Sequence, residues 1–397
     1  MSELKRYDKK VAYVVRDIER ALGFPDLCDG FFIITNKTEF ANEQAKTNER
    51  ILLIQQKGLL STASLLQEPL TQAFLKKHSI EQIVVFKPSS IIENQCKQLG
   101  LKLLNPPVSL SRQIEEKTTQ LDFFADLKKD FPNYTVDTLE NLSWPCKPCV
   151  LQFNTSHTGS GTLYLAGQSQ LDELKEKFPK RPARMVEFIP GPTYTINNVV
   201  GSDAIILGNI SFQITGIKPF TDNIFATIGN DFAYASKSLQ FFQKRKFLKL
   251  ARKVGTILQS HGWKGAYGID ALWSVTEKRW YLLEINARQP ASVTFESSLQ
   301  GTSTLLEAHM MAMLNIPLST FRSKRIKNGA QIILRGGKDD NVDTMGLEGK
   351  ARKLRDKGFS VIKNEKQTSG GELLRIRTTD RLMKTDTKLI ENELLEV

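Results

Sequence analysis

The most constraining feature of the sequence is a pair of apolar segments, residues 265–273 and 280–286, joined by a short polar turn. Two such segments predict a β-hairpin. Side chains alternate between the two faces of a strand, so Glu284 and Asn286 share one face while the residues between them point to the core. With the turn centred midway between the segments, Asp270 is expected roughly opposite Glu284. Three oxygen-bearing side chains therefore converge on one face of the hairpin.

This convergence predicts a metal site formed by Asp270, Glu284 and Asn286. Carboxylate and amide oxygens are the hard ligands that Mg²⁺ prefers, and Mn²⁺ is the alternative ion. Two buried carboxylates that face each other without a cation would repel in a low dielectric. Arg288 follows on the same side, where its guanidinium can bind phosphate oxygens. The alternative is a solvent-facing hairpin whose acidic side chains stay hydrated.

This stretch resembles the closing motif of the ATP-grasp superfamily, in which glycine–x–aspartate, a hairpin and glutamate–x–asparagine–x–arginine follow one another. The resemblance extends backward over roughly residues 105–315, in the order of the family's motifs. It implies that the three hairpin ligands hold one or two Mg²⁺ ions. It also implies that Arg288 is the catalytic residue that holds the transferring phosphoryl group and the acyl phosphate.

The resemblance further implies how ATP is held. Lys117, after Glu116, is similar to a family lysine that contacts the nucleotide phosphates. The segment from Met185 to Gly191 resembles the hinge strand between the two grasping subdomains. A glycine-bearing turn before residue 162 resembles the mobile loop over the terminal phosphates, because glycine lets backbone N–H groups approach phosphate. In the hinge Glu187 and the backbones of Phe188 and Ile189 would meet the adenine, and the loop residues are His157, Thr158, Gly159, Ser160 and Gly161.

Two positions depart from the family pattern. Gln152 stands where the family commonly has a second phosphate-binding lysine, so ATP would meet a donor without charge. Thr193 stands where an acidic residue often holds the ribose. Lys218 is a candidate replacement for the missing charge, and His157 is either a ligand-contacting residue or an ordinary turn residue. A catalytically weak ATP-binding regulatory protein is therefore an alternative to an enzyme.

Alternating short apolar runs and helical stretches predict an α/β fold with three parts. The expected N-terminal domain, residues 1–108, is a parallel α/β unit similar to the domain that usually precedes the ATP-grasp fold. Residues 109–318 form the expected ATP-grasp body of two α+β subdomains, with a mobile lid at about 130–185. Residues 319–397 form an expected small C-terminal domain. We also expect one helix from near residue 109 through residue 124 and one amphipathic helix over residues 236–260.

Composition narrows the function further. The net charge of +12 in 397 residues invites a nucleic-acid partner, but basic residues are spread along the chain without an aromatic platform, so we expect none. No apolar run has the length of a membrane-spanning helix, and we expect neither a membrane partner nor a signal peptide. Four cysteines make no disulfide framework, and the pair Cys146 and Cys149 is expected to be structural. The expected compartment is the cytoplasm.

The resemblance to the ATP-grasp superfamily implies an ATP-dependent carboxylate–amine ligase. A small-molecule carboxylate would be phosphorylated to an acyl phosphate, and an amine would then form an amide or peptide bond with release of ADP and phosphate. An acid–thiol or carboxylase-type ligase on the same fold is the nearest alternative. Dimers are frequent among such ligases, so a homodimer is one candidate assembly.

Overall fold

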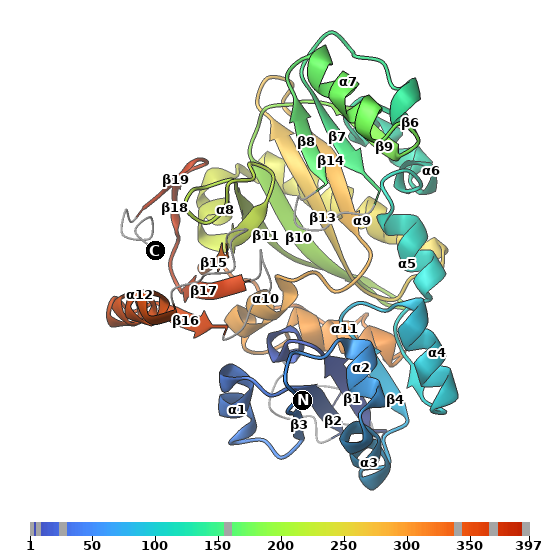
Figure 1. Cartoon of the computed structure of the whole chain (residues 1–397), viewed down its shortest axis with the longest axis vertical. Helices are drawn as coiled ribbons and strands as arrows, with labels where there is room; N and C mark the ends of the chain where they lie inside the picture. The colour runs from blue at the N-terminus through green and yellow to red at the C-terminus, as the bar shows by residue number, and fades with distance from the viewer. Residues whose placement is uncertain are drawn as a thin grey trace.

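The computed structural model describes residue 4 and residues 9–23, 30–154, 161–336, 344–364 and 372–390. These residues form an N-terminal parallel sheet, a large antiparallel sheet and a small four-stranded sheet. In Figure 1 the N-terminal sheet lies at the bottom, the large sheet in the middle and the small sheet at the top. The predicted α/β fold is confirmed.

The N-terminal part is a five-stranded sheet in the order β3-β2-β1-β4-β5, with every neighbouring pair parallel. Short apolar runs of the sequence form these strands. Its strands are β1 (Val11–Val15), β2 (Phe31–Asn36), β3 (Ile51–Ile54), β4 (Gln82–Val85) and β5 (Lys102–Leu103), and its helices are η2 (Ile18–Ala21), α1 (Glu39–Ala45), α2 (Thr62–Gln67), α3 (Pro69–Lys77) and α4 (Ser90–Gln98).

The central sheet has eight strands in the order β14-β13-β10-β11-β12-β15-β17-β16, all antiparallel. The helix expected over residues 236–260 is two helices, α8 (Phe232–Ser238) and α9 (Phe241–Ser260). The break arises because the Gln243 side chain accepts a hydrogen bond from the backbone N–H of Gln240 and starts a new helix there. The first strands are β10 (Thr193–Val200), β11 (Ile205–Thr215), β12 (Thr227–Asp231), β13 (Gly265–Ser274) and β14 (Arg279–Asn286).

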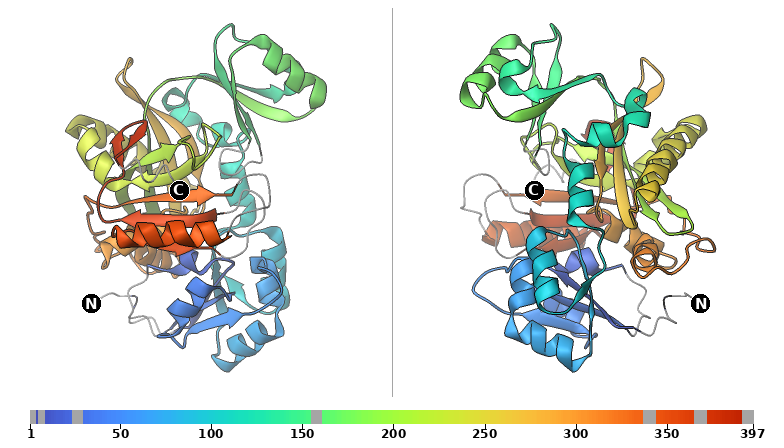
Figure 2. Two further views of the ribbon diagram at one scale, coloured as in Figure 1. Left: turned by 60° about the vertical axis from the view of Figure 1, so that its left-hand side comes forward. Right: turned by 90° about the vertical axis from the view of Figure 1, so that its right-hand side faces the viewer.

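The C-terminal strands extend this sheet. Strand β15 (Ala330–Arg335) pairs with β12, and β17 (Glu372–Thr378) and β16 (Ser360–Lys363) follow outward. Strands on both sides of residue 319 thus share one sheet, and the domain boundary there stays a prediction. In the left view of Figure 2 the C-terminal strands and α12 lie directly above the N-terminal domain. The remaining elements are α10 (Val293–Gln300), α11 (Leu305–Met313), α12 (Thr344–Asp356), β18 (Met383–Thr385) and β19 (Lys388–Leu389).

The four-stranded sheet, which we call the lid, has the order β6-β9-β7-β8 and carries helix α7. Leu151 and Met185 belong to the lid's own hydrophobic core. Because side chains alternate, Gln152 and Arg184 point to the opposite face, toward β14. The elements of the lid are β6 (Tyr134–Thr138), η4 (Leu139–Asn141), β7 (Cys149–Phe153), β8 (Thr162–Leu165), α7 (Gln168–Lys177) and β9 (Pro182–Glu187).

The helix expected over residues 109–124 is interrupted. It forms α5 (Val108–Glu115) and α6 (Gln120–Phe123), followed by η3 (Ala125–Asp130). The side-chain amide of Gln120 donates hydrogen bonds to the carbonyls of Ile114 (2.8 Å) and Ile285 (3.1 Å). These bonds fasten the interruption to the end of β14, and Lys117 lies inside it.

Candidate functional site

The hairpin has the predicted register. Strands β13 and β14 are antiparallel, with Asp270 opposite Glu284 and Gly268 opposite Asn286. The pairing of β13 with β14 is regular from the turn as far as Ala271, and the register shifts between Ala271 and Asp270. The central sheet thereby brings the two carboxylates to neighbouring positions on adjacent strands.

Asp270 is enclosed by polar partners. The hydroxyl of Thr195, on the neighbouring strand β10, donates to one carboxylate oxygen of Asp270. The side-chain amide of Asn286 donates to the other oxygen at 3.3 Å. Burial and the nearby charge of Glu284 raise the pKa of Asp270 to about 6. The expected repulsion between the two facing carboxylates therefore acts in the folded chain and makes Asp270 harder to ionise.

The residues fit a divalent cation of the magnesium type. A cation between Asp270 and Glu284 would remove their repulsion, and the amide oxygen of Asn286 is a further hard donor. Among the described residues no group of three His, Cys, Asp or Glu side chains is placed to hold a metal. A complete coordination shell on this hairpin would thus need oxygens from water and from a ligand such as phosphate.

Lys117 reaches the same carboxylates from the interruption between α5 and α6. Its Nζ lies 2.8 Å from Oε1 of Glu284, and its side chain is only 6% exposed. Burial lowers the pKa of Lys117, although Glu284 partly opposes this. Burial acts to raise the pKa of Glu284, but Lys117 and Arg288 outweigh it and hold that pKa below its usual range. The two partners lie more than 160 positions apart in the sequence, and the fold joins the buried lysine to the partly exposed glutamate.

Arg288 stands beside the carboxylates of the hairpin. Its guanidinium pairs with Glu115, at the last position of α5. Lys87 lies 3.5 Å from the other oxygen of Glu115. Helix α5 is itself fastened to this loop, because the hydroxyl of Ser111 donates to the carbonyl of Ala287 at 2.8 Å. Glu115 thus holds the arginine in place, a role that the sequence patterns did not point to.

A cavity of about 230 Å³ lies between the lid and the central sheet. The residues expected to meet adenine, Glu187, Phe188 and Ile189, lie on its wall, and so does Thr193. The carboxylate of Glu187 is bound by Lys147 at 2.6 Å and by the amide of Asn133 at 2.8 Å. The other lining residues are mainly apolar and include Leu121, Phe131, Val150, Val186, Ile224, Phe225, Leu272 and Leu282.

Gln152 and Arg184 lie on the same cavity wall, directly opposite each other on β7 and β9. The Gln152 side-chain oxygen accepts hydrogen bonds from Nε (2.9 Å) and Nη2 (2.6 Å) of Arg184. Nη2 also donates to the carbonyl of Leu283 at 3.1 Å. Arg184 is 2% exposed. Sequence reasoning did not select it, although a charged residue between Ala183 and Met185 in a strand is a usable signal.

Several expected residues remain outside this cluster. His157, Thr158, Gly159 and Ser160 lie outside the described residues, while the carbonyl of Gly161 accepts a hydrogen bond from Phe153 N at 2.9 Å.

Lys218 is exposed and lies 3.5 Å from Asp222. Cys146 is exposed and Cys149 is buried, and both are free thiols. Burial raises the pKa of Cys149, which is the opposite of what a reactive thiol requires.

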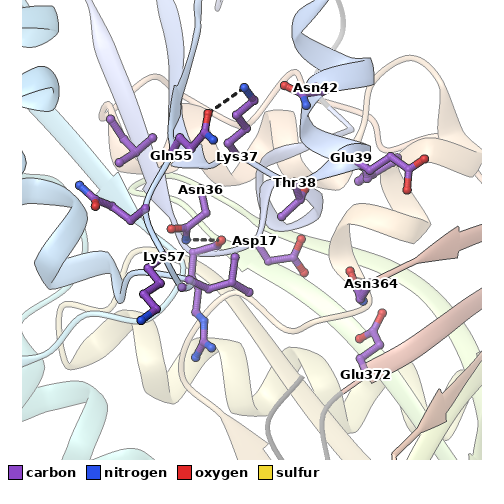
Figure 3. A pocket seen from close by; sticks show the side chains of 16 residues that line it. Asp17, Asn36, Lys37, Thr38, Glu39, Asn42, Gln55, Lys57, Asn364 and Glu372 are labelled. Atoms are coloured by element: carbon purple, nitrogen blue, oxygen red, sulfur yellow. Dashed lines mark hydrogen bonds between the residues drawn. The ribbon is translucent and has the colours of Figure 1, made fainter. Parts of the chain in front are cut away.

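A second, larger hollow of about 800 Å³ lies at the carboxyl ends of β1, β2 and β3. Figure 3 shows Lys37 reaching the side chain of Gln55, a hydrogen bond of 2.9 Å, while Asn364 and Glu372 approach from the C-terminal part of the chain. Cations and carboxylates both line it: Arg16, Lys37 and Lys57, and Asp17, Glu39 and Glu372. In open α/β sheets, ligands bind outside the carboxyl ends of the strands.

None of the helices in the described ranges is long and apolar enough to cross a membrane.

Neither a protein-family model nor a curated protein matches the sequence. Solved structures do match the fold. Carboxyaminoimidazole ribonucleotide synthase from Aspergillus clavatus, solved with ATP, has a TM-score of 0.65 at 16% identity, over 94% of this chain and 93% of its own. L-amino acid ligase from Bacillus licheniformis has a TM-score of 0.61 at 13% identity, over 94% of each chain. Biotin carboxylase from Campylobacter jejuni has a TM-score of 0.60 at 14% identity, over 94% and 88%.

Proposed function

We propose that this chain, which has the ATP-grasp fold, is an ATP-dependent ligase that joins a carboxylate to an amine. The observation that carries the proposal is the meeting of Lys117, Asp270, Glu284 and Asn286 beside the cavity under the lid. A buried cation, two facing carboxylates and an enclosed cavity are the parts that a magnesium–nucleotide site needs.

ATP would place its base in the 230 Å³ cavity. The apolar walls there suit a flat heteroaromatic ring, while the backbone at Phe188 and Ile189 supplies hydrogen-bonding groups at one edge. The phosphates would then extend toward Lys117, whose buried ammonium has a single carboxylate partner among the described ion pairs. The solved synthase that matches this fold carries ATP, which supports the same ligand here.

Asp270, Glu284 and Asn286 would hold Mg²⁺, with Mn²⁺ as the alternative. The ion supplies charge neutralisation for the phosphates when it is bound. The chain's own contribution is to orient both carboxylates: Thr195 and Asn286 bond Asp270, and Lys117 bonds Glu284. The raised pKa of Asp270 means that this carboxylate gains most from a bound cation.

In the proposed reaction, an oxygen of the substrate carboxylate attacks the γ-phosphorus of ATP, and the bond to ADP breaks. The amine nitrogen then attacks the acyl carbon, loses a proton, and phosphate leaves. Arg288 would neutralise charge on the transferring group, with Glu115 fixing the guanidinium. Catalysis of this kind rests on positioning and electrostatic stabilisation rather than on covalent work by the protein. Closure of the lid would exclude water, which otherwise hydrolyses the acyl phosphate.

The polar hollow at the N-terminal sheet is the proposed chamber for the carboxylate and amine substrates. Its mixture of cations and carboxylates suits small molecules that carry both charges. One wall residue, Asp17, lies 4.0 Å from Arg20, whose guanidinium donates to the carbonyl of Ala291 at 3.0 Å. Ala291 lies three residues after Arg288, so these two contacts connect the wall of the hollow to the segment that carries Arg288.

A carboxylase-type or acid–thiol ligase is the second candidate. It is favoured by the likeness to biotin carboxylase and to carboxyaminoimidazole ribonucleotide synthase. The two candidates differ in the acceptor that triggers ADP release: an amine in the first, and bicarbonate or a thiol in the second.

A regulatory protein without turnover would instead be stabilised by ATP against heat and would release no ADP with any acceptor.

Glu284→Ala tests the proposed function. Purified variant and wild-type protein are incubated with Mg-ATP and substrate pools, and ADP is measured. We expect the variant to lose turnover while its circular dichroism spectrum stays unchanged. Glu173→Ala, which removes an exposed carboxylate from α7, is the matched control and should retain turnover. Turnover that survives Glu284→Ala would refute the metal assignment.

A further inference from the structure

Arg184 is a buried cation with an unused donor. It is 2% exposed, and within the described part of the chain no carboxylate lies within ion-pairing distance of it. Its Nε and Nη2 are bonded to Gln152 and to the carbonyl of Leu283, but Nη1 has no hydrogen-bond partner there. A buried charge with an unsatisfied donor is costly and calls for an explanation.

The guanidinium is fixed rather than loosely packed. Gln152 accepts two of its N–H groups with a single oxygen, which sets the plane of the fork. The carbonyl of Leu283 anchors the same fork to β14, one residue before Glu284. Burial lowers the pKa of Arg184 to about 10, so the group remains charged at neutral pH. A pre-positioned cation of this kind loses little conformational entropy when it binds an anion.

The position of Arg184 in the cavity determines which anion it can meet. It lines the same wall as the hinge residues Phe188 and Ile189, and it lies close enough to Lys117 for their charges to interact. Arg184 belongs to the lid and Lys117 to the interruption between α5 and α6, so two different parts of the chain supply cations near the carboxylate pair. An anion that contacts both would neutralise both cations.

We propose that Arg184 binds the phosphates of the nucleotide and that Gln152 positions it, so that the pair replaces the single lysine usual at position 152. In this chain the cation is Arg184 on β9, directly opposite Gln152 on β7, and the Gln152 amide orients the guanidinium. This inference rests on the proposed ATP site. It removes the reason to regard Gln152 as a sign of weakened nucleotide binding.

The bond from Arg184 to Leu283 adds a consequence for the lid. Arg184 belongs to the lid and Leu283 to the central sheet, so a phosphate bound by this guanidinium would be held by a residue that already bridges the two. A bidentate guanidinium can serve both partners at once, whereas a lysine ammonium offers a point charge without a fixed direction.

The test compares the binding of ATP, ADP and adenosine by calorimetry in wild type, Arg184→Met and Arg184→Lys. Loss of charge-assisted hydrogen bonds predicts that Arg184→Met weakens ADP and ATP binding about 10- to 100-fold, with adenosine within about threefold. Arg184→Lys should bind ADP and ATP more tightly than Arg184→Met and less tightly than wild type. The control is Arg181→Met, which removes an exposed guanidinium stacked on Phe153 in the same subdomain and should change none of the three affinities.

A second variant separates phosphate binding from a purely structural role. Gln152→Lys in the Arg184→Met background places a cation on the opposite strand and should recover at least about tenfold in ADP affinity. Equal ADP affinity in wild type and Arg184→Met would overturn the inference while leaving the proposed function intact. Equal loss of ADP and adenosine binding, with no recovery by Gln152→Lys, would also overturn it, because the residue would then only support the fold. A wild-type protein that binds no nucleotide would overturn the proposed function and this inference together.

Discussion

Lys117 and Glu284 form an ion pair in which Nζ lies 2.8 Å from Oε1. The pair joins the interruption between α5 and α6 to the C-terminal end of β14. The lysine is almost completely buried, and the glutamate is its only partner among the described ion pairs. Breaking one side of such a pair leaves the other charge uncompensated. The pair therefore links the stability of the site to its capacity to bind an anionic ligand.

Lys117→Met keeps the length of the side chain and removes the charge. We expect nucleotide affinity to fall about 10- to 100-fold, because a charge-assisted contact to phosphate is lost. Lys253→Met, an exposed lysine of α9 that lies 3.7 Å from Asp130, is the control and should leave affinity unchanged. Calorimetric titration with ADP measures both. A variant that binds ADP as tightly as wild type would contradict the assignment of Lys117.

Asp270→Asn reports on the raised pKa of Asp270. That pKa of about 6 lies above the value near 4 of an unfolded chain, so the folded state holds the proton more tightly. The resulting stabilisation is complete below pH 4 and is lost as pH rises through 6. Wild type should therefore lose roughly 2–3 kcal/mol relative to the variant between pH 4 and pH 7.

The measurement is the denaturant midpoint of both proteins at the two ends of that pH range. Asp222→Asn, in which the carboxylate is 94% exposed, is the control and should track wild type at both pH values. A difference between wild type and Asp270→Asn that is the same at both pH values would show that Asp270 titrates normally.

Arg288→Ala should slow catalysis more than it weakens ATP binding. Loss of a donor that acts mainly on the transition state costs about 10²- to 10³-fold in kcat. Glu115→Gln should give a smaller loss in the same direction, because the guanidinium would be held by a neutral partner. Steady-state kinetics with varied ATP separate kcat from KM. A large rise in the KM for ATP with kcat unchanged would place Arg288 in nucleotide binding only.

Gly191→Ala should disturb the cavity wall. A Cβ at Gly191 would lie 2.3 Å from the carbonyl oxygen of Trp273, so the backbone of the hinge would have to move. We expect adenosine affinity to fall about 5- to 150-fold, since overpacking of this kind costs about 1–3 kcal/mol. Gly167→Ala, where a Cβ would meet nothing within 4 Å, is the control in the lid. Unchanged adenosine binding by Gly191→Ala would argue against the base occupying this cavity.

The local parts of the site could be predicted because they depend on short-range patterns. The alternation of side chains in residues 280–286 placed Glu284 and Asn286 on one face, and the length of the turn placed Asp270 opposite Glu284. The strands on either side of the expected loop, β7 and β8, are present, and the assignment of the hinge stays a prediction. The N-terminal parallel sheet followed from the length and spacing of its apolar runs.

The remaining parts could not be predicted because they depend on pairings between distant segments. Gln152 and Arg184 are opposite each other only because β7 and β9 pair across the helix between them. Apolar periodicity continues through residues 236–260, whereas the side chain of Gln243 starts a new helix. The C-terminal strands extend the central sheet through the pairing of β12 with β15, which no local pattern encodes.

The most direct test of the central claim is ADP release by the purified protein with Mg-ATP and pooled carboxylic acids, crossed with pooled amines and amino acids. We predict that ADP and phosphate form when a carboxylate and an amine are both present, and that an amide product accumulates in equal amount. Parallel reactions replace the amine with bicarbonate or a thiol. The proposed carboxylate–amine ligase would be contradicted if ADP formed only when bicarbonate or a thiol replaced the amine. It would also be contradicted if no combination released ADP.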